Sequence, residues 1–182
     1  MSVPSYRDSV ARLKERVEIS GDALPEVVRV PRPDDDPVGP SLFRMRLDGA
    51  ELTGLCLRGL YVSRSELKRV SFAGSDLQLA AFNWSDLIEC DFSGVDLRQA
   101  DLRSSVFSRC RFDGATLDGA DMRGTRFDSC SFTGATLAQA KLQRGGTLAW
   151  LGVGRGQEAL PLSQEQRATI LWVRDAPEAP GG

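Results

Sequence analysis

The sequence predicts an all-β solenoid with four five-residue sides per turn, and three features carry that prediction. Large apolar residues recur at every fifth position from Leu42 to Leu142. A second column lies two residues before each of them and consists of small residues from Ser65 onward. Finally, a pattern of the form small-x-Phe/Leu-x-Gly-x-x-Leu returns every 20 residues, starting at Ala50, Val70, Cys90, Cys110 and Cys130.

The five-residue period excludes an ordinary helix or strand. Apolar residues recur about every 3.6 positions on an amphipathic helix and every 2 on a strand. The period is instead typical of a repeat architecture, in which each unit buries its apolar side against its neighbours. Residues 20 apart would stack directly above one another. With strands stacked about 4.8 Å apart, about five turns would form a rod on the order of 25 Å long.

The repeat units resemble those of the pentapeptide-repeat family, whose units follow an A(D/N)LxG-type pattern. Three examples are Ala100-Asp101-Leu102-Arg103, Ala115-Thr116-Leu117-Asp118-Gly119 and Ala120-Asp121-Met122-Arg123-Gly124. The resemblance covers residues 41–144. It implies a right-handed, four-sided parallel β-helix in which the large residue and the small residue two before it point inward. It also implies that most members are not enzymes.

Residues 1–40 and 145–182 lie outside the resemblance, and each is predicted to form an element that caps one end of the solenoid. Residues 1–40 predict a helix followed by a linker rich in Pro and Asp, and residues 145–182 predict a capping helix followed by a disordered tail. In the first helix, over residues 5–18, Tyr6, Val10, Leu13 and Val17 are spaced 4, 3 and 4 apart. Ser5 is its expected N-cap and Gly21 its expected stop. We interpret this helix as a lid over the N-terminal end of the solenoid. The alternative is a helix that binds a partner or a membrane, which the offsetting acidic residues disfavour.

The second helix is expected to begin at Ser163, because Ser163 and Gln166 have the spacing of a capping box. Ala168, Leu171 and Trp172 would then share one helical face. That face has more apolar surface than a short helix hides alone. We therefore expect it to dock on the last turn of the solenoid or on a second copy of the chain, forming a homodimer.

Composition sets limits on function. The net charge is −2 and 26% of the residues are charged, so nothing calls for a direct nucleic-acid or membrane partner. No apolar run approaches the roughly 18 residues needed to span a bilayer, and residues 1–10 lack the apolar stretch of a signal peptide. A cytoplasmic location is the expectation. The absence of His rules out His-based triads, and the Asp residues are spaced by the repeat rather than gathered, so no catalytic residue and no cofactor is expected.

Three of the four cysteines fall in the small inward column. Cys90, Cys110 and Cys130 are 20 apart and should form a stacked ladder, whereas Cys56 should face outward. The ladder has a metal-site interpretation, but thiolate sites usually have tight spacing such as C-x-x-C. A buried free cysteine behaves as a small apolar residue. We therefore interpret the ladder as packing and expect no metal.

Five residues form the candidate partner-contact patch. Trp84 occupies an outward corner where polar residues or Gly are usual, and Arg64 should lie directly beneath it, suited to a cation–π contact. Leu79, Ile88 and Tyr61 fall at outward positions in adjacent turns. Single apolar surface residues are normal, but a group of them is typical of a contact surface.

Two functions remain open at this point. The first is a non-enzymatic scaffold for protein–protein interaction, with an unknown partner. The second follows from a branch of the family that resembles duplex DNA, binds type II topoisomerases such as DNA gyrase and protects them from quinolone-like poisons. Such mimicry needs a dominantly acidic surface. Residues 41–144 hold 14 Lys/Arg and 13 Asp/Glu, a difference of +1, which favours the scaffold.

Overall fold

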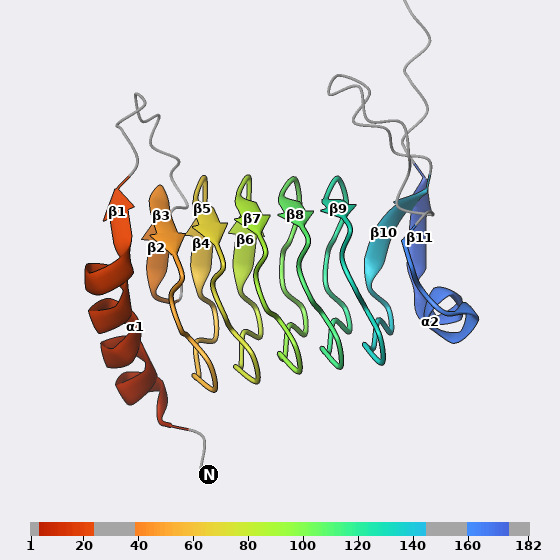
Figure 1. Ribbon diagram of the computed structural model, residues 1–182. Helices are drawn as coiled ribbons and strands as arrows, with labels where there is room; N and C mark the ends of the chain where they lie inside the picture. Colours follow the sequence, from red (N-terminus) through yellow and green to blue (C-terminus); the bar gives the residue numbers. More distant parts are fainter. Residues whose placement is uncertain (1–3, 24–38, 145–159, 175–182) are drawn as a thin grey trace, which may run out of the picture.

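The computed structural model describes residues 4–23, 39–144 and 160–174, and its body is a parallel β-solenoid (Figure 1). Each turn takes 20 residues, because Leu42 pairs with Val62 and Val62 with Phe82. The predicted four-sided parallel β-helix is confirmed. The predicted linker falls mostly in residues 24–38, and the predicted tail in residues 175–182; both lie outside the described residues.

Two sides of the solenoid carry the regular strands. Side 1 contains β2 (Ser41–Phe43), β4 (Tyr61–Ser63), β6 (Ala81–Asn83) and β10 (Lys141–Arg144), and bridges at Asp101 and Asp121 continue it between β6 and β10. Side 2 contains β3 (Met45–Asp48), β5 (Glu66–Lys68), β7 (Asp86–Ile88), β8 (Val106–Ser108) and β9 (Arg126–Asp128). Side 3, which includes residues 91–93, and side 4, which includes residues 96–98, are joined by isolated parallel bridges.

A residue with positive φ lies at every corner from Arg44 to Gln139, one every five residues. This left-handed conformation turns the chain between one side and the next. For any residue other than Gly, the left-handed conformation costs about 1–2 kcal/mol. Gly occupies nine of the corners, and the other eleven carry a side chain. The five-residue period of the sequence is therefore the spacing of the corners.

The interior is filled by the two inward columns. On side 3, Phe72, Phe92, Phe112 and Phe132 form one stack with ring centroids 5.2, 5.0 and 5.0 Å apart. Phe92 is 1% exposed and also meets Phe82 and Phe107 edge-on. Both geometries are the favoured ones for aromatic pairs. The predicted inward direction of the large column is confirmed.

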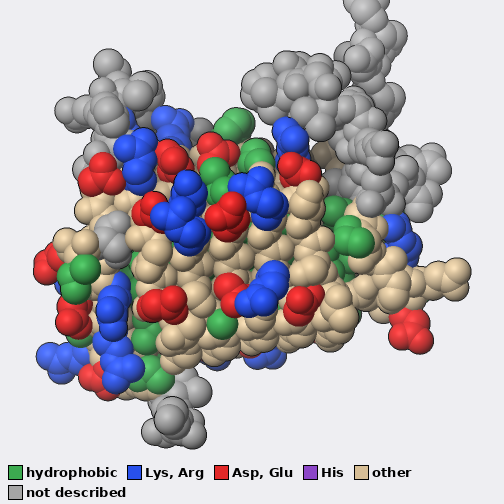
Figure 2. Space-filling model, in the orientation of Figure 1, with side chains coloured by type: hydrophobic (Ala, Val, Ile, Leu, Met, Phe, Trp, Pro, Cys, Tyr) green, Lys and Arg blue, Asp and Glu red, His purple; other side chains and the backbone are tan. Residues whose placement is uncertain are grey.

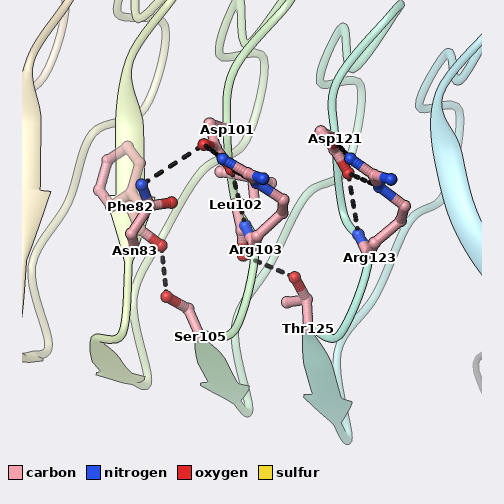
Figure 3. Close-up of polar contacts among 9 residues, drawn as sticks. All are labelled: Phe82, Asn83, Asp101, Leu102, Arg103, Ser105, Asp121, Arg123 and Thr125. Carbon is pink, nitrogen blue, oxygen red and sulfur yellow. Dashed lines mark hydrogen bonds and ion pairs between the residues drawn. The ribbon is translucent and has the colours of Figure 1, made fainter. Parts of the chain in front are cut away.

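Polar members of the small column are buried and hydrogen-bonded. Ser65 Oγ donates to the carbonyl of Leu42 at 2.6 Å and accepts from the amide of Met45 at 3.0 Å. Ser105 and Thr125 donate in the same way to the carbonyls of Phe82 and Leu102 (Figure 3). A hydroxyl in this column therefore supplies partners to backbone groups that would otherwise be buried without one.

The N-terminal end is covered by α1 (Tyr6–Ser20) and β1 (Gly21–Ala23), at the red end of Figure 1. The predicted N-cap Ser5 is confirmed, since its side chain accepts a hydrogen bond from the amide of Asp8, and the helix ends at Ser20, with the predicted stop Gly21 as its C-cap. Leu13 is buried against the solenoid. Ser9 Oγ accepts the amide of Cys56 at 2.9 Å, and β1 pairs antiparallel with β3. The predicted lid therefore also satisfies the open edge of the first turn.

At the opposite end, α2 (Gln164–Thr169) begins with the predicted capping box between Ser163 and Gln166. Gln166 Nε2 also donates to the carbonyls of Phe132 and Ala135, each at 2.8 Å. These contacts attach α2 to the last turn of the solenoid.

The predicted helical face of Ala168, Leu171 and Trp172 is wrong. The helix ends at Thr169, and β11 (Leu171–Arg174) pairs parallel with β10, so Leu171 and Trp172 lie on a strand. The open edge of β10 explains the change, because its unpaired backbone groups find partners only in another strand. Ala168 and Leu171 are exposed, Trp172 packs partly against the core, and Ile170 is buried.

We expect Phe92→Ala to lower the free energy of unfolding by about 3–5 kcal/mol, because it removes the centre of the buried aromatic stack. Chemical denaturation measures the change. Phe127→Ala is the matched control, since Phe127 lies in the same inward column but is only partly buried, and it should cost less. A loss for Phe92→Ala below about 1 kcal/mol would contradict the packing described.

Candidate contact surface

Two large apolar side chains stand exposed at the corners that flank β6. Leu79 lies at the corner before this strand and is 61% exposed, and Trp84 lies at the corner after it and is 60% exposed. Both backbones are left-handed, with φ of 60° and 56°. The side chains therefore stand on either edge of side 1, with Ala81 between them.

The other side-chain-bearing corners differ in character. The nine remaining non-glycine residues there are all polar or charged: Arg44, Arg64, Arg69, Glu89, Gln99, Ser104, Arg109, Ser129 and Gln139. Bulky apolar residues are unusual in the left-handed region. Leu79 and Trp84 also gain little from burial, because most of each side chain remains in water. Folding thus gives no reason for these two residues, and such backbone outliers are typical of functional sites.

Aromatic and cationic residues extend this area toward the N-terminal end. Phe43 on β2 stacks on Tyr61 of β4, with ring centroids 6.5 Å apart and an interplanar angle of 18°. Arg64 is exposed at the corner one turn before Trp84. We call Phe43, Tyr61, Arg64, Leu79 and Trp84 the aromatic surface.

The structure brings together four of the five residues predicted as a patch. Ile88 is the exception, because it lies on β7 of side 2 and is only partly exposed. Phe43 was missed by sequence reasoning. Its position directly after the inward Leu42 makes it outward, and that signal was available in the five-residue pattern.

The predicted cation–π contact between Arg64 and Trp84 is not present. The stacking itself is correct, because the amide of Arg64 donates to the carbonyl of Asn83, next to Trp84. The guanidinium of Arg64 nevertheless forms no ring contact and no ion pair within residues 4–23, 39–144 and 160–174. Both side chains point outward from corners, where nothing holds them together.

Farther along side 1 the surface becomes polar. Asp101 pairs with Arg103 at 2.7 Å and Asp121 with Arg123 at 2.6 Å, one pair above the other (Figure 3). Asn83 donates to Asp101 at 3.4 Å and links this ladder to β6. Burial raises the pKa of the Asp121 carboxyl, but its hydrogen bonds with Arg123 lower that pKa by more, to below its ordinary value.

Most carboxylates of the solenoid are compensated, and Figure 2 shows acidic and basic side chains interspersed over one face. The ion pairs are Asp48–Arg69, Glu66–Arg46, Asp76–Arg58, Glu89–Arg109, Asp91–Arg111, Asp96–Arg98, Asp101–Arg103, Asp121–Arg123 and Asp128–Arg126. Each exposed pair is worth about 0–1 kcal/mol. Their main effect is to cancel charge: Glu51, Asp86, Asp113 and Asp118 are the carboxylates of residues 41–144 outside these pairs, and they are spread over sides 2, 3 and 4.

The cysteine ladder occupies the interior as predicted, with Cys90, Cys110 and Cys130 all buried. Their thiols contact the carbonyls of Leu67, Leu87 and Phe107 at 3.3–3.5 Å, as the hydroxyls of this column do. The contact with Cys130 lowers the pKa of Cys110, but the contact with Cys90 and burial raise it more, to about 12. The neighbouring Cys90 and burial therefore favour the protonated form of the Cys110 thiol.

Metal sites and membrane-spanning helices find no candidate in the described ranges. Within residues 4–23, 39–144 and 160–174, Cys, Asp and Glu residues nowhere gather in a group of three or more suited to a metal ion. Over the same part of the chain, no helix has the length and apolar character that crossing a bilayer requires. The aromatic surface therefore remains the strongest candidate site.

Comparison with known proteins agrees with the repeat pattern. The family model for pentapeptide repeats matches in eight copies, over residues 65–103 and 105–144. No curated protein matches the chain.

Similar solved structures include three proteins of known role or location. The chain is 25% identical to a pentapeptide repeat protein of the Arabidopsis thaliana thylakoid lumen, covering 66% of this chain and 70% of that one, with a TM-score of 0.31. It is 21% identical to HetL of the cyanobacterium Nostoc, involved in heterocyst differentiation regulation (63% and 68% covered, TM-score 0.33). It is 16% identical to QnrB1, a plasmid-mediated fluoroquinolone resistance protein (57% and 65% covered, TM-score 0.28). At these TM-scores no functional argument follows.

We expect Trp84→Gly to leave the free energy of unfolding unchanged or to raise it by up to about 1 kcal/mol. The substitution relieves the left-handed strain, which Gly does not feel, and this gain is partly offset by the greater freedom of Gly in the unfolded chain. Urea denaturation measures the change.

Ser129→Gly is the matched control for this prediction, because Ser129 is a polar corner residue with φ of 54°. It should behave in the same way as Trp84→Gly. Destabilisation by Trp84→Gly alone would mean that the indole stabilises the fold, and the functional interpretation of its exposure would be wrong.

Proposed function

Residues 65–103 and 105–144 belong to the pentapeptide-repeat family, and from that premise we propose that the chain is a non-enzymatic scaffold that binds a protein partner through the aromatic surface. The observation that carries the proposal is the pair of exposed apolar residues, Leu79 and Trp84, in left-handed backbone. The left-handed backbone at both positions destabilises the fold, and the mostly exposed side chains add little stability by burial. Binding a partner would bury both.

The composition of the aromatic surface supports the same proposal. Aromatic residues and Arg are enriched in protein–protein interfaces and dominate their binding energy, with Trp, Tyr and Arg the most frequent hot spots. Here Tyr61, Arg64 and Trp84 lie on adjacent turns. They are also carried by a solenoid whose inward columns hold each turn in register, so that little ordering is needed on binding.

Capture of partners from a lysate of the native host tests the proposal. We expect a protein retained by the full chain and by Ser129→Gly, but lost with Leu79→Gly and Trp84→Gly, because these variants remove the contact and keep the corner conformation. Mass spectrometry identifies the retained protein. Equal retention by all variants, or retention of nothing, would contradict binding through this surface.

Protection of a type II topoisomerase stays the alternative. A DNA-like surface needs dense and uncompensated negative charge. Nine of the thirteen carboxylates in residues 41–144 are paired with arginine, and the other four do not line one side. This distribution supports the scaffold over the alternative.

A supercoiling assay separates the two functions. We expect a molar excess of the protein to leave DNA gyrase supercoiling unaltered, with and without a quinolone, because the surface lacks the charge of a DNA duplex. Restored supercoiling in the presence of the quinolone would favour topoisomerase protection instead.

Two further expectations remain predictions: a cytoplasmic location, and a homodimer through the C-terminal region. If the homodimer forms, the residue best placed for it is Leu171, which is 42% exposed on β11, rather than a helical face.

A further inference from the structure

We propose that the aromatic surface recognises an acidic, extended peptide segment that also carries apolar side chains. The inference rests on the proposed function, because it concerns the same surface and adds the chemistry of its partner.

The residues that build the aromatic surface and the side around it include no carboxylate. Side 1 and its two corners are built from residues 39–45, 59–65 and 79–85 in three successive turns, and these 21 residues contain no Asp or Glu. They contain two cations, Arg44 and Arg64, at one corner. On a chain with 25 acidic residues, this area presents the opposite sign to the net charge.

Arg64 is the group best placed to bind an anion. It is exposed, and within the described part of the chain its guanidinium forms no ion pair. By contrast, Arg103 and Arg123 on the same side are held by Asp101 and Asp121. Guanidinium groups bind carboxylates through paired hydrogen bonds. A carboxylate on the partner would therefore find at Arg64 a cation that no acid of this surface neutralises.

The borders of the area fix where the acidic segment lies. Glu66 and Asp86 begin side 2, immediately beyond the corner of Arg64 and Trp84. Burial, and after it the neighbouring Glu66, raises the pKa of the Asp86 carboxyl above its ordinary value. Asp101 marks the next turn of side 1. An acidic segment that avoids Asp86 and Asp101 would lie over Tyr61 and Ala81, between Leu79 and Trp84.

The dimensions of the area favour a single segment over a folded domain. Three turns spaced about 4.8 Å apart extend over about 10 Å, and a five-residue side is at most about 17 Å wide. The resulting footprint is on the order of 170 Å² in projection, about the size of a few residues of extended chain. An extended peptide fits this size, with apolar side chains against Leu79 and Trp84.

A single-stranded nucleic acid is the other anion that stacks on aromatic residues. Proteins that bind it combine stacking residues with a long positively charged groove along the phosphate backbone. The net charge of the chain is −2, and the cations that continue side 1 at Arg103 and Arg123 are already paired. The observations therefore favour carboxylates on a peptide.

A selection experiment tests the proposal with the full chain. A library of short random peptides is selected on the immobilised protein, and peptides that also bind Trp84→Gly are discarded. The remaining peptides are synthesised, and their affinities are measured by fluorescence anisotropy for the wild type, Arg64→Glu and Lys141→Glu. Lys141 is the matched control, because it is an exposed cation on side 1 beyond the aromatic surface.

We expect the remaining peptides to be acidic and to carry apolar residues. Arg64→Glu should weaken their binding by about tenfold or more, as should replacement of their Asp and Glu by Asn and Gln. Lys141→Glu should have no such effect. Glu at this corner is compatible with the fold, because Glu89 occupies an equivalent corner with φ of 56°.

Three results would overturn the inference, and they are distinguishable. Peptides that depend on Trp84 but are neutral or basic, or are insensitive to Arg64→Glu, would refute the acidic partner and leave the scaffold proposal standing. The absence of any Trp84-dependent peptide would refute the peptide partner, and the lysate capture with Trp84→Gly decides the scaffold proposal separately. Trp84-dependent binding of single-stranded oligothymidylate, without acidic peptides, would identify a nucleic acid as the partner.

Discussion

The structure depends on one backbone constraint, a left-handed residue at every fifth position. Each such residue turns the chain onto the next side, so that four of them bring residue i+20 above residue i. Hydrogen bonds between turns then join equivalent positions, as between the amide of Phe92 and the carbonyl of Arg111 at 2.7 Å. Each side chain therefore lies above the side chain 20 residues earlier in the sequence. The Phe72–Phe132 stack, the thiol ladder and the Asp–Arg pairs all follow from that repetition.

The same repetition creates two open edges, and different devices satisfy them. At the N-terminal end, Ser9 from a helix and an antiparallel strand supply the partners. At the C-terminal end, Gln166 binds two carbonyls and a parallel strand prolongs the ladder. Without a cap, the exposed edge of a terminal turn would be free to pair with a strand of another chain. The atypical flanks are therefore part of the fold, although they lack its pattern.

The solenoid was predictable from sequence because the local rule is repeated 21 times from Leu42 to Leu142. The caps were predictable where a local signal exists, as at Ser5 and Ser163. The prediction failed at Leu171 and Trp172, because helical periodicity carries no information about the open edge of β10, which is distant in sequence. The prediction of an Arg64–Trp84 contact failed for a related reason. The 20-residue spacing places the two Cα atoms in one column, but it does not fix the direction of side chains that point into solvent. Phe43 was missed although its outward position followed from the pattern.

Corners differ from the other four positions of each unit in what they contribute to folding. Inward positions must fill the core, and outward positions pair with the turns above and below. A corner needs only a left-handed backbone, which Gly provides at least cost. Side chains at corners are thus the least constrained by the fold and the most available for recognition. The corner that carries Arg44, Arg64, Trp84, Ser104 and Gly124 shows this freedom, since it changes from cationic to aromatic to small within one column. A fold this uniform becomes specific only where its corners differ, and the sharpest difference among the described corners lies at Leu79 and Trp84.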